Sequence, residues 1–361
     1  MTRVAVIGAG SIGANIAYRL AARGAEVTVV DAGKPGNGTS AASISWLSTF
    51  PQIAGSVPAM VAHRRRTNDG FRRLAGEIGD GWIHWTGTLT WADLPRTAAR
   101  LRQDFAAMTA MGEPLRELDA GAVRAAEPGL DPPPDTPVYL EEDGGWVDAP
   151  AMVAALLRGA GWHGATVLQD APVLAVKADG DRHVVRTPEG EVTADVVVNA
   201  AGSWASHVGA LAGAPVPLDL RPGLVVWSRP LATPIGRVIN STTLNIRPDP
   251  DGGVAVHWRG EDTYTAHGYN AETPAQVIEA AAEVIPELRG TAPARSAVGV
   301  RPVPPGGPVV GWHPSRPGLY VAVSHGGIGW GPTWGDLAAA AILDGDTSPA
   351  AEAFTPRRFL R

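Results

Sequence analysis

The sequence predicts an α/β protein of two domains, one built on a parallel sheet and the other on a mostly antiparallel sheet. Three observations predict this fold. A strand–helix–strand unit opens the chain, valine-rich strands between glycine turns and helices recur in its middle and at its end, and alternating strand-like pieces fill residues 216–256. With 361 residues, 45% of them hydrophobic, the chain is long enough for two packed cores.

The positions of the recurring strands predict how the two domains divide the chain. The parallel-sheet domain takes the discontinuous segments 1–45, 145–215 and 300–361, and the second domain takes segments 46–144 and 216–299. The second domain is therefore inserted twice into the first.

The first unit has the pattern of a Rossmann-like nucleotide-binding fold. The apolar run Val4–Ile7 predicts a buried strand, residues 12–22 predict a helix, and Val27–Val30 predict a second strand that ends at Asp31. Asp31 follows Gly13 by 18 residues, where a carboxylate accepts hydrogen bonds from an adenosine ribose.

The turn between strand and helix carries G-x-G-x-x-G at Gly8, Gly10 and Gly13. In this motif the first glycine permits a tight turn, the second lets backbone approach a pyrophosphate, and the third lets the helix pack close to the strand. Ser11 and Ile12 then open the helix, whose N–H groups and dipole favour phosphate. The motif predicts a nucleotide and does not distinguish NAD from FAD.

The remaining elements follow from periodicity and turn signals. Helices are expected over residues 58–79, 96–111, 149–160, 274–288 and about 333–343. A strand pair is expected within 82–91, an irregular connection over 127–137, and further strands over residues 165–168, 173–178, 195–199, 224–227, 253–258 and 319–324.

Composition argues against several kinds of partner. The net charge is -6 and no basic tail is present, so neither nucleic acid nor an anionic membrane is expected to bind. We interpret the basic run His63–Arg66 as a solvated helix face. No uninterrupted apolar run reaches 18 residues, so no membrane span is expected. The absence of cysteine excludes disulfides and thiolate metal sites, no metal site is expected, and a cytoplasmic protein fits.

Three stretches together match a known family. The first is residues 4–31 with 39–42, the second is A-D-V-V-V-N-A-A-G-S-W at 194–204, and the third is V-R-P at 300–302 followed by G-L-Y-V-A-V-S-H-G-G-I-G-W at 318–330. In order and spacing they resemble the FAD-dependent D-amino-acid, glycine and sarcosine oxidoreductases, the DAO-type flavoproteins. The last stretch is most similar to the D-amino-acid dehydrogenase branch.

The resemblance implies a Rossmann-like FAD domain and an antiparallel-rich substrate domain. It also implies non-covalent FAD, since the chain has no cysteine and the loop 39–46 has no histidine that could link to the flavin. The residues expected to bind FAD are Gly8, Gly10, Ser11, Ile12, Gly13, Asp31, Thr39, Ser40, Ala41, Ala42, Val173, Ala200, Ala201, Gly202, Trp204, Gly326, Gly327, Ile328 and Gly329.

The resemblance further implies oxidation of a C–N bond in an amino acid or N-substituted amino acid, by hydride transfer to the flavin, giving an imine that hydrolyses. Arg301 of V-R-P is expected to bind the substrate carboxylate, because a guanidinium holds a carboxylate bidentately. The other residues expected around the substrate are His257, Arg259, His325, Trp46 and Trp330.

The electron acceptor is O2 or a quinone, and the lysine count favours the quinone. Sarcosine-oxidase relatives use a lysine above the flavin, and that position falls near Ala255 here. The chain's two lysines, Lys34 and Lys177, lie in segments that do not line a pocket.

Two other functions stay open on the sequence alone. The same fold could oxidise a 2-hydroxy acid, with His257 or His325 as the base. The chain could instead be a non-catalytic flavin-binding subunit of a complex, although Arg301 and the flavin loop are intact.

Overall fold

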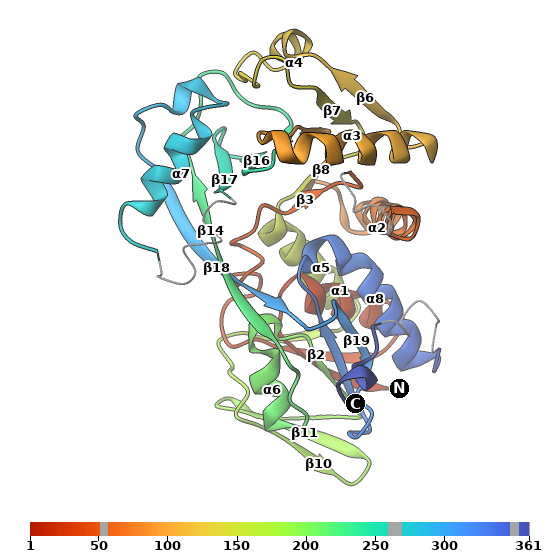
Figure 1. Ribbon diagram of the computed structural model, residues 1–361. Helices are drawn as coiled ribbons and strands as arrows, with labels where there is room; N and C mark the ends of the chain where they lie inside the picture. The colour runs from red at the N-terminus through yellow and green to blue at the C-terminus, as the bar shows by residue number, and fades with distance from the viewer. Residues whose placement is uncertain (51–56, 259–268, 347–353, 361) are drawn as a thin grey trace.

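The computed structural model describes residues 1–50, 57–258, 269–346 and 354–360. Figure 1 shows two lobes, with both termini in the lower lobe and strands β14 and β18 running from one lobe to the other. The fold is mixed α/β, as predicted.

The lower lobe is built on a six-stranded sheet in the order β19-β20-β13-β1-β2-β9. Its strands are β1 (Arg3–Ile7), β2 (Glu26–Val30), β9 (Thr166–Leu168), β13 (Val196–Asn199), β19 (Val309–Trp312) and β20 (Leu319–Val323). All neighbours run parallel except β19 and β20. Because Ile7 pairs with Asn199, the turns that follow β1 and β13 meet at one edge of the sheet.

Helices α1 (Ser11–Ala22), α5 (Ala149–Trp162) and α8 (Gly327–Leu343) pack in this lobe's core. Helix α8 begins six residues before the predicted start near Thr333, so that prediction was wrong. Its glycines Gly327, Gly331 and Gly335 recur every four residues and face α1: added Cβ atoms would lie 3.0, 2.6 and 3.0 Å from Ile12 or Asn15 atoms. Close packing on α1 therefore stabilises a helical start that glycine disfavours intrinsically.

The upper lobe is built on an eight-stranded sheet in the order β18-β14-β17-β16-β15-β5-β7-β6. Its strands are β5 (Thr88–Thr90), β6 (Leu115–Leu118), β7 (Val138–Glu141), β14 (Asp219–Trp227), β15 (Val238–Asn240), β16 (Leu244–Pro248), β17 (Val254–Trp258) and β18 (Arg295–Val303). Its neighbouring strands run antiparallel except β5 and β15, so it is antiparallel-rich as predicted.

Two predictions about local pairing and helix length were wrong. The strands within residues 82–91 do not pair with each other: β4 (Ile83–His84) joins β3 (Trp46–Leu47) and β8 (Gly145–Val147) in a small sheet, whereas β5 joins the eight-stranded sheet. The helix expected to reach residue 288 ends as α7 (Thr273–Ala281), and a 3-10 turn η3 (Pro286–Leu288) follows. Pro286 has no N–H to continue a helix.

The remaining elements complete the two lobes. They are α2 (Val57–Ile78), α3 (Pro95–Ala110), α4 (Ala120–Ala126), α6 (Ala205–Leu211), the 3-10 turns η1 (Gly202–Trp204) and η4 (Pro356–Leu360), and the sheet of β10 (Ala175–Asp179), β11 (Arg182–Thr187) and β12 (Gly190–Ala194). Within the described part of the chain, no helix is long and apolar enough to cross a membrane.

The strands of each large sheet come almost entirely from the segments expected for one domain. β18 alone crosses the expected boundary at residue 300. Residues Leu47, Phe71, Leu74, Trp82 and Ile83 of the segment 46–144 nevertheless pack in the core of the lower lobe with α1 and α8. The division of the chain therefore stays a prediction, and the β14–β18 ribbon runs between the two lobes.

Candidate active site

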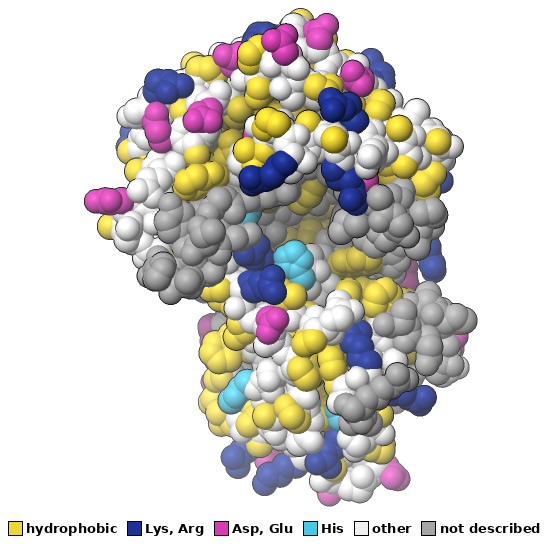
Figure 2. Space-filling view, in the orientation of Figure 1, with side chains coloured by type: hydrophobic (Ala, Val, Ile, Leu, Met, Phe, Trp, Pro, Cys, Tyr) yellow, Lys and Arg dark blue, Asp and Glu magenta, His cyan; other side chains and the backbone are white. Residues whose placement is uncertain are grey.

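A cavity of about 610 Å³ lies where the two lobes meet. Its walls come from the β1–α1 turn, the loop 39–46, the turn after β13, the strands β14, β16, β17 and β18, and residues 324–330. Figure 2 shows the surface hollowed between the lobes, with basic and histidine side chains gathered in the hollow.

The glycines of the first turn have different roles. Gly8 has φ of 103°, and a Cβ there would lie 2.5 Å from the carbonyl oxygen of Ala200. A Cβ on Gly13 would lie 1.8 Å from the carbonyl oxygen of Gly8. Both glycines therefore hold β1, α1 and the turn after β13 together. Gly10, in contrast, lines the cavity itself, and a Cβ there would meet only the Ser40 hydroxyl, at 3.4 Å.

Two helix N-termini open onto this cavity. Gly10–Ile12 at the start of α1 and Gly326–Gly329 at the start of α8 both line it. The N-cap residues are Gly10 and Gly326, and glycine has no side chain that could cap the helix. The first turns of both helices, which are fully described, contain no Asp or Glu. The positive ends of two helix dipoles therefore favour negative charge in one cavity.

The Asp31 carboxylate, predicted to accept hydrogen bonds from an adenosine ribose, holds the backbone at Ala9 and Gly33 in this structure. Its two oxygens accept hydrogen bonds from the backbone N–H of Ala9 at 2.6 Å and of Gly33 at 2.9 Å. The N–H of Ala171 donates to the Asp31 carbonyl at 2.8 Å, so the chain leading to Val173 runs past the same strand end. The N–H of Ser11 donates to the Ser40 hydroxyl at 3.1 Å. Glycines in the first turn, two helix N-termini at the cavity and an acid at the end of β2 fit a dinucleotide cofactor.

Most of the predicted site residues converge on the cavity. Those that line it are Gly10, Ser11, Ile12, Thr39, Ser40, Ala42, Trp46, Ala200, Gly202, His257, Arg301, His325, Gly326, Gly327, Ile328, Gly329 and Trp330. Those placed outside the lining are Gly8, Gly13, Asp31, Ala41, Val173, Ala201 and Trp204. The Trp204 side chain is 70% exposed, and Arg259 lies outside the described residues.

Sequence reasoning missed part of the lining. The missed residues are Ser43, Ile44, Ser45, Gly223, Val225, Asn245, Gly299, Pro302 and Ser324. The three loop residues continue the small-residue run after Ala42, a signal that the sequence did carry. Gly223 and Gly299 are a different case: they pair across β14 and β18, and only this register brings them together.

Arg301 is fixed to the cavity wall by the neighbouring strand. Its Nε donates to the carbonyl of Arg221 at 3.2 Å, and its Nη2 donates to the carbonyl of Pro222 at 2.9 Å. A Cβ on Gly223 would lie 3.3 Å from the Arg301 Cζ, so the guanidinium lies against this glycine. Both features hold the guanidinium in a defined orientation at the cavity.

A row of polar side chains crosses the large sheet above the cavity. Thr90, Asn240, Asn245 and His257 are consecutive cross-strand partners, so their side chains share one face. The Asn245 amide donates to Asn240 at 2.8 Å, and His257 Nδ1 lies 2.9 Å from the carbonyl of Leu224. Asn245 and His257 reach the cavity, which gives this wall hydrogen-bonding groups.

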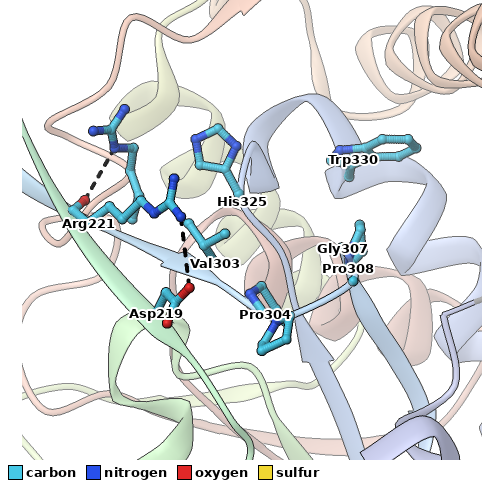
Figure 3. Close-up of a pocket in the computed structure, with 11 residues that line it drawn as sticks. Asp219, Arg221, Val303, Pro304, Gly307, Pro308, His325 and Trp330 are labelled. Atoms are coloured by element: carbon cyan, nitrogen blue, oxygen red, sulfur yellow. Dashed lines mark hydrogen bonds and ion pairs between the residues drawn. The ribbon is translucent and has the colours of Figure 1, made fainter. Parts of the chain in front are cut away.

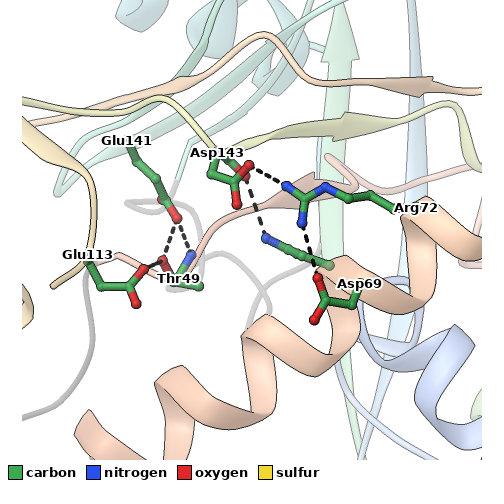
Figure 4. A network of polar contacts seen from close by, with 7 residues as sticks. Thr49, Asp69, Arg72, Glu113, Glu141 and Asp143 are labelled. Carbon is green, nitrogen blue, oxygen red and sulfur yellow. Dashed lines mark hydrogen bonds and ion pairs between the residues drawn. The ribbon is translucent and has the colours of Figure 1, made fainter. Parts of the chain in front are cut away.

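Behind Trp46 the chain is held by a buried carboxyl group, drawn in Figure 4. Glu141, at the end of β7, accepts from the backbone N–H of Thr49 at 2.6 Å and from its hydroxyl at 2.5 Å, and its other oxygen contacts the Ser48 hydroxyl. The Ser48 hydroxyl also contacts the carbonyl of Phe50, and its single hydrogen serves only one of these oxygens.

Burial raises the pKa of Glu141, and a proton on Glu141 would donate to Ser48. The hydroxyl of Ser48 would then donate to Phe50. The structure therefore fits a neutral Glu141. A second, exposed group in Figure 4 joins Arg72 of α2 to Asp69 and Asp143.

The fold and the cavity fit the class of two-lobed dinucleotide-binding proteins, with an arginine on the cavity wall. The family profile of the FAD-dependent oxidoreductases, DAO, matches residues 3–341. The chain therefore belongs to the DAO family, and it is an FAD-dependent oxidoreductase.

Individual relatives agree along nearly the whole chain. The chain is similar to the glycine oxidase of Geobacillus kaustophilus, with 27% identity over 96% of this chain and 94% of that protein. It is also similar to the D-amino-acid oxidase of Bradyrhizobium diazoefficiens, with 27% identity over 99% of both chains. The crystal structure of the Geobacillus kaustophilus enzyme superposes with a TM-score of 0.81 and 26% identity, covering 97% of this chain and 96% of that one.

Proposed function

We propose that the protein oxidises the C–N bond of an amino acid or N-substituted amino acid to an imine, which water hydrolyses to an oxo acid and ammonia or an amine. The orientation of Arg301 carries the proposal: its guanidinium is fixed by two carbonyls on the wall of the cavity onto which both helix N-termini open. The named relatives support amine or amino acid oxidation.

When bound in this cavity, FAD would supply the two-electron acceptor for the hydride that leaves the substrate Cα. The chain's own residues orient the substrate: Arg301 binds its carboxylate through a bidentate ion pair. The Trp330 ring stacks on the Trp334 ring, with their centroids 5.3 Å apart. Trp330 and Trp46 give the cavity an apolar surface that limits the access of water. The N-terminus of α8, which lines the cavity, would favour negative charge on a cofactor held there.

The amine must lose a proton as the C=N bond forms. An amine that binds in its neutral form needs no strong base, and His257 and Asn245 offer hydrogen-bonding partners on this wall. The imine then hydrolyses without further redox chemistry, so electrons and protons balance within the substrate and FAD.

We further propose that a quinone or dye reoxidises the enzyme faster than O2 does. Both lysines of the chain, Lys34 and Lys177, are exposed and lie outside the cavity lining. A fixed cation beside the flavin favours superoxide formation, and among the described residues the cavity lining contains no lysine for this role. Stopped-flow mixing of the reduced enzyme with each acceptor gives both rates, and reoxidation by O2 much faster than turnover would identify an oxidase. A cytoplasmic location stays a prediction.

The amine proposal is tested by anaerobic flavin bleaching with matched substrate pairs. Each amino acid is compared with the 2-hydroxy acid that has the same side chain, for example alanine with lactate, in both enantiomers. We expect the amine of one pair to bleach the flavin. Bleaching by the hydroxy acids alone would favour the second candidate, for which His257 and His325 in the lining are the possible bases. No bleaching by either set would favour a non-catalytic subunit.

A further inference from the structure

A second cavity, of about 850 Å³, adjoins the first. The two cavities share Arg301, His325 and Trp330, so these residues form the boundary between them. Figure 3 shows Arg221 and His325 on one side of the second cavity, and Trp330 and Pro308 on the other. We call this second space the outer cavity. The position of the substrate carboxylate at Arg301 rests on the proposed function.

Arg221 and Arg301 face the outer cavity together because of strand register. They are direct antiparallel partners on β14 and β18, so their Cβ atoms point to one face about 5 Å apart. Along this face Gly223, Val225 and Gly299 line the first cavity, and Asp219, Arg221 and Val303 line the outer one. One ribbon face therefore carries a continuous path from the first cavity, past Arg301, to Arg221.

Arg221 brings a second guanidinium to this face, and it forms an ion pair with Asp219. Its carboxylate lies 3.8 Å from Arg221 Nη2, too far for a hydrogen bond, and both side chains are more than 60% exposed. Arg221 is therefore exposed and loosely paired, and its guanidinium is available to a second anion in the outer cavity.

The opposite wall of the outer cavity is a fixed turn. Residues 304–308, P-P-G-G-P, form it, and Arg358 of η4 donates to the carbonyls of Pro308 at 2.7 Å and Gly307 at 2.5 Å. The turn held by Arg358 and the paired Arg221 and Arg301 together form a preorganised space beyond the proposed position of the substrate carboxylate.

We propose that Arg221 binds a second anionic group of the substrate, and that the enzyme prefers amino acids carrying an additional carboxylate over neutral ones. The first carboxylate pairs with Arg301 while the second extends into the outer cavity toward Arg221. Arg221 is then a specificity-determining residue.

The test uses pairs of substrates that differ in charge and little in shape: glutamate with glutamine and aspartate with asparagine, in both enantiomers. The measured quantity is the second-order rate constant of anaerobic flavin reduction. We expect the acidic member to react faster, and Arg221→Gln to reduce the acidic-to-amide ratio about tenfold, the effect of one ion pair near a surface. Arg289→Gln is the matched control, since Arg289 is equally exposed, at 63%, and also pairs with one acid, Glu279.

A binding measurement keeps this inference separate from the proposed function. Glutarate and its monoamide, glutaramate, are titrated into the oxidised holoenzyme, with the perturbation of the flavin spectrum or the heat of binding as readout. We expect glutarate to bind more tightly, and Arg221→Gln to remove most of the difference while Arg289→Gln keeps it. If no amine bleaches the flavin yet this pattern holds, the amine chemistry fails and the anion site stands. Equal affinities of the wild type for both ligands, or an Arg221→Gln variant with an unchanged preference, would overturn the inference.

Discussion

The two walls of the first cavity are built in different ways. The wall that we propose holds FAD, called here the nucleotide wall, consists of backbone, glycines and helix ends from the β1–α1 turn and the α8 start. The wall that we propose holds the substrate, called here the substrate wall, consists of side chains on β14, β16, β17 and β18. The first wall is encoded within short contiguous stretches. The second depends on pairing between strands that are distant in the sequence. Arg221 of β14 and Arg301 of β18, for example, are paired although 80 residues separate them in the chain.

Because of this difference, mutations on the two walls should affect FAD binding and substrate oxidation separately. Backbone on the nucleotide wall is held by packing, so changes there should affect FAD binding and folding together. Side chains on the substrate wall stand on a sheet that other residues stabilise, so changes there should affect the substrate alone.

The largest effect is expected for Gly13→Ala. The added Cβ would lie 1.8 Å from the Gly8 carbonyl oxygen, so β1 and α1 would have to separate. We expect a loss of at least about 3 kcal/mol in stability and loss of bound flavin, at the upper end for overpacked sites. The measurements are thermal unfolding and the flavin-to-protein absorbance ratio.

Gly10→Ala is the matched control for Gly13→Ala, because its Cβ would meet only the Ser40 hydroxyl at 3.4 Å. We expect this variant to fold normally and to bind FAD more weakly, since Gly10 lines the cavity. Equal stability losses in the two variants would contradict the distinction between Gly13, which is needed for packing of α1 on β1, and Gly10, which lines the cavity.

Arg301→Ala tests the substrate wall. We expect the variant to stay yellow and to lose about 100- to 1000-fold in the rate constant of flavin reduction at low substrate, or about 3–4 kcal/mol, typical for truncating one partner of an ion pair. Arg301→Lys should recover only part of this loss, since lysine lacks the bidentate fork. A colourless Arg301→Ala protein would show that this strand belongs to the FAD site.

Asp31→Ala tests the nucleotide wall with a smaller change. Removing the carboxylate leaves the N–H groups of Ala9 and Gly33 without their acceptors. We expect FAD binding to weaken by about 1.5–3 kcal/mol, and the rate of substrate reduction in the FAD-saturated variant to stay within about twofold of the wild type. Equilibrium titration of apoprotein with FAD measures the first quantity. Unchanged FAD affinity would contradict the role predicted for Asp31.

The smallest effect concerns pH and Glu141. Burial raises the pKa of this carboxyl in the folded state, so above the ordinary glutamic acid pKa, near 4.3, the folded state binds more protons than the unfolded state. Stability therefore falls as pH rises through this window, by about 1.4 kcal/mol per pH unit, until the folded-state pKa is passed. Glu141→Gln should lack this slope and gain stability relative to the wild type as pH rises.

Urea unfolding of both proteins between pH 4 and pH 8 measures the slope. Glu142→Gln is the control, because the neighbouring Glu142 is 58% exposed and pairs with Arg116. A Glu141→Gln protein with the same pH slope as the wild type would mean that Glu141 is ionised in the folded state.

Much of the nucleotide wall could be predicted because its signals are local. The G-x-G-x-x-G turn, the strand ending at Asp31, and the small residues 200–202 each lie within a few residues of the groups that they position. Where local signals competed with packing, prediction failed. The start of α8 was placed too late because glycines signal a loop, and their packing against α1 became visible only in the structure.

From the sequence alone came the fold class, a nucleotide site in the contiguous G-x-G-x-x-G unit, and, through three separated stretches that resemble the DAO-type flavoproteins, the FAD cofactor and the choice of Arg301 as a candidate. Only the tertiary structure decided that Arg301 lies over Gly223, that Gly223 meets Gly299, and that Arg221 stands opposite Arg301. The physical reason is register. Side chains on paired strands share a face only when the pairing is fixed, and that pairing joins segments separated by a helix and three other strands of the same sheet.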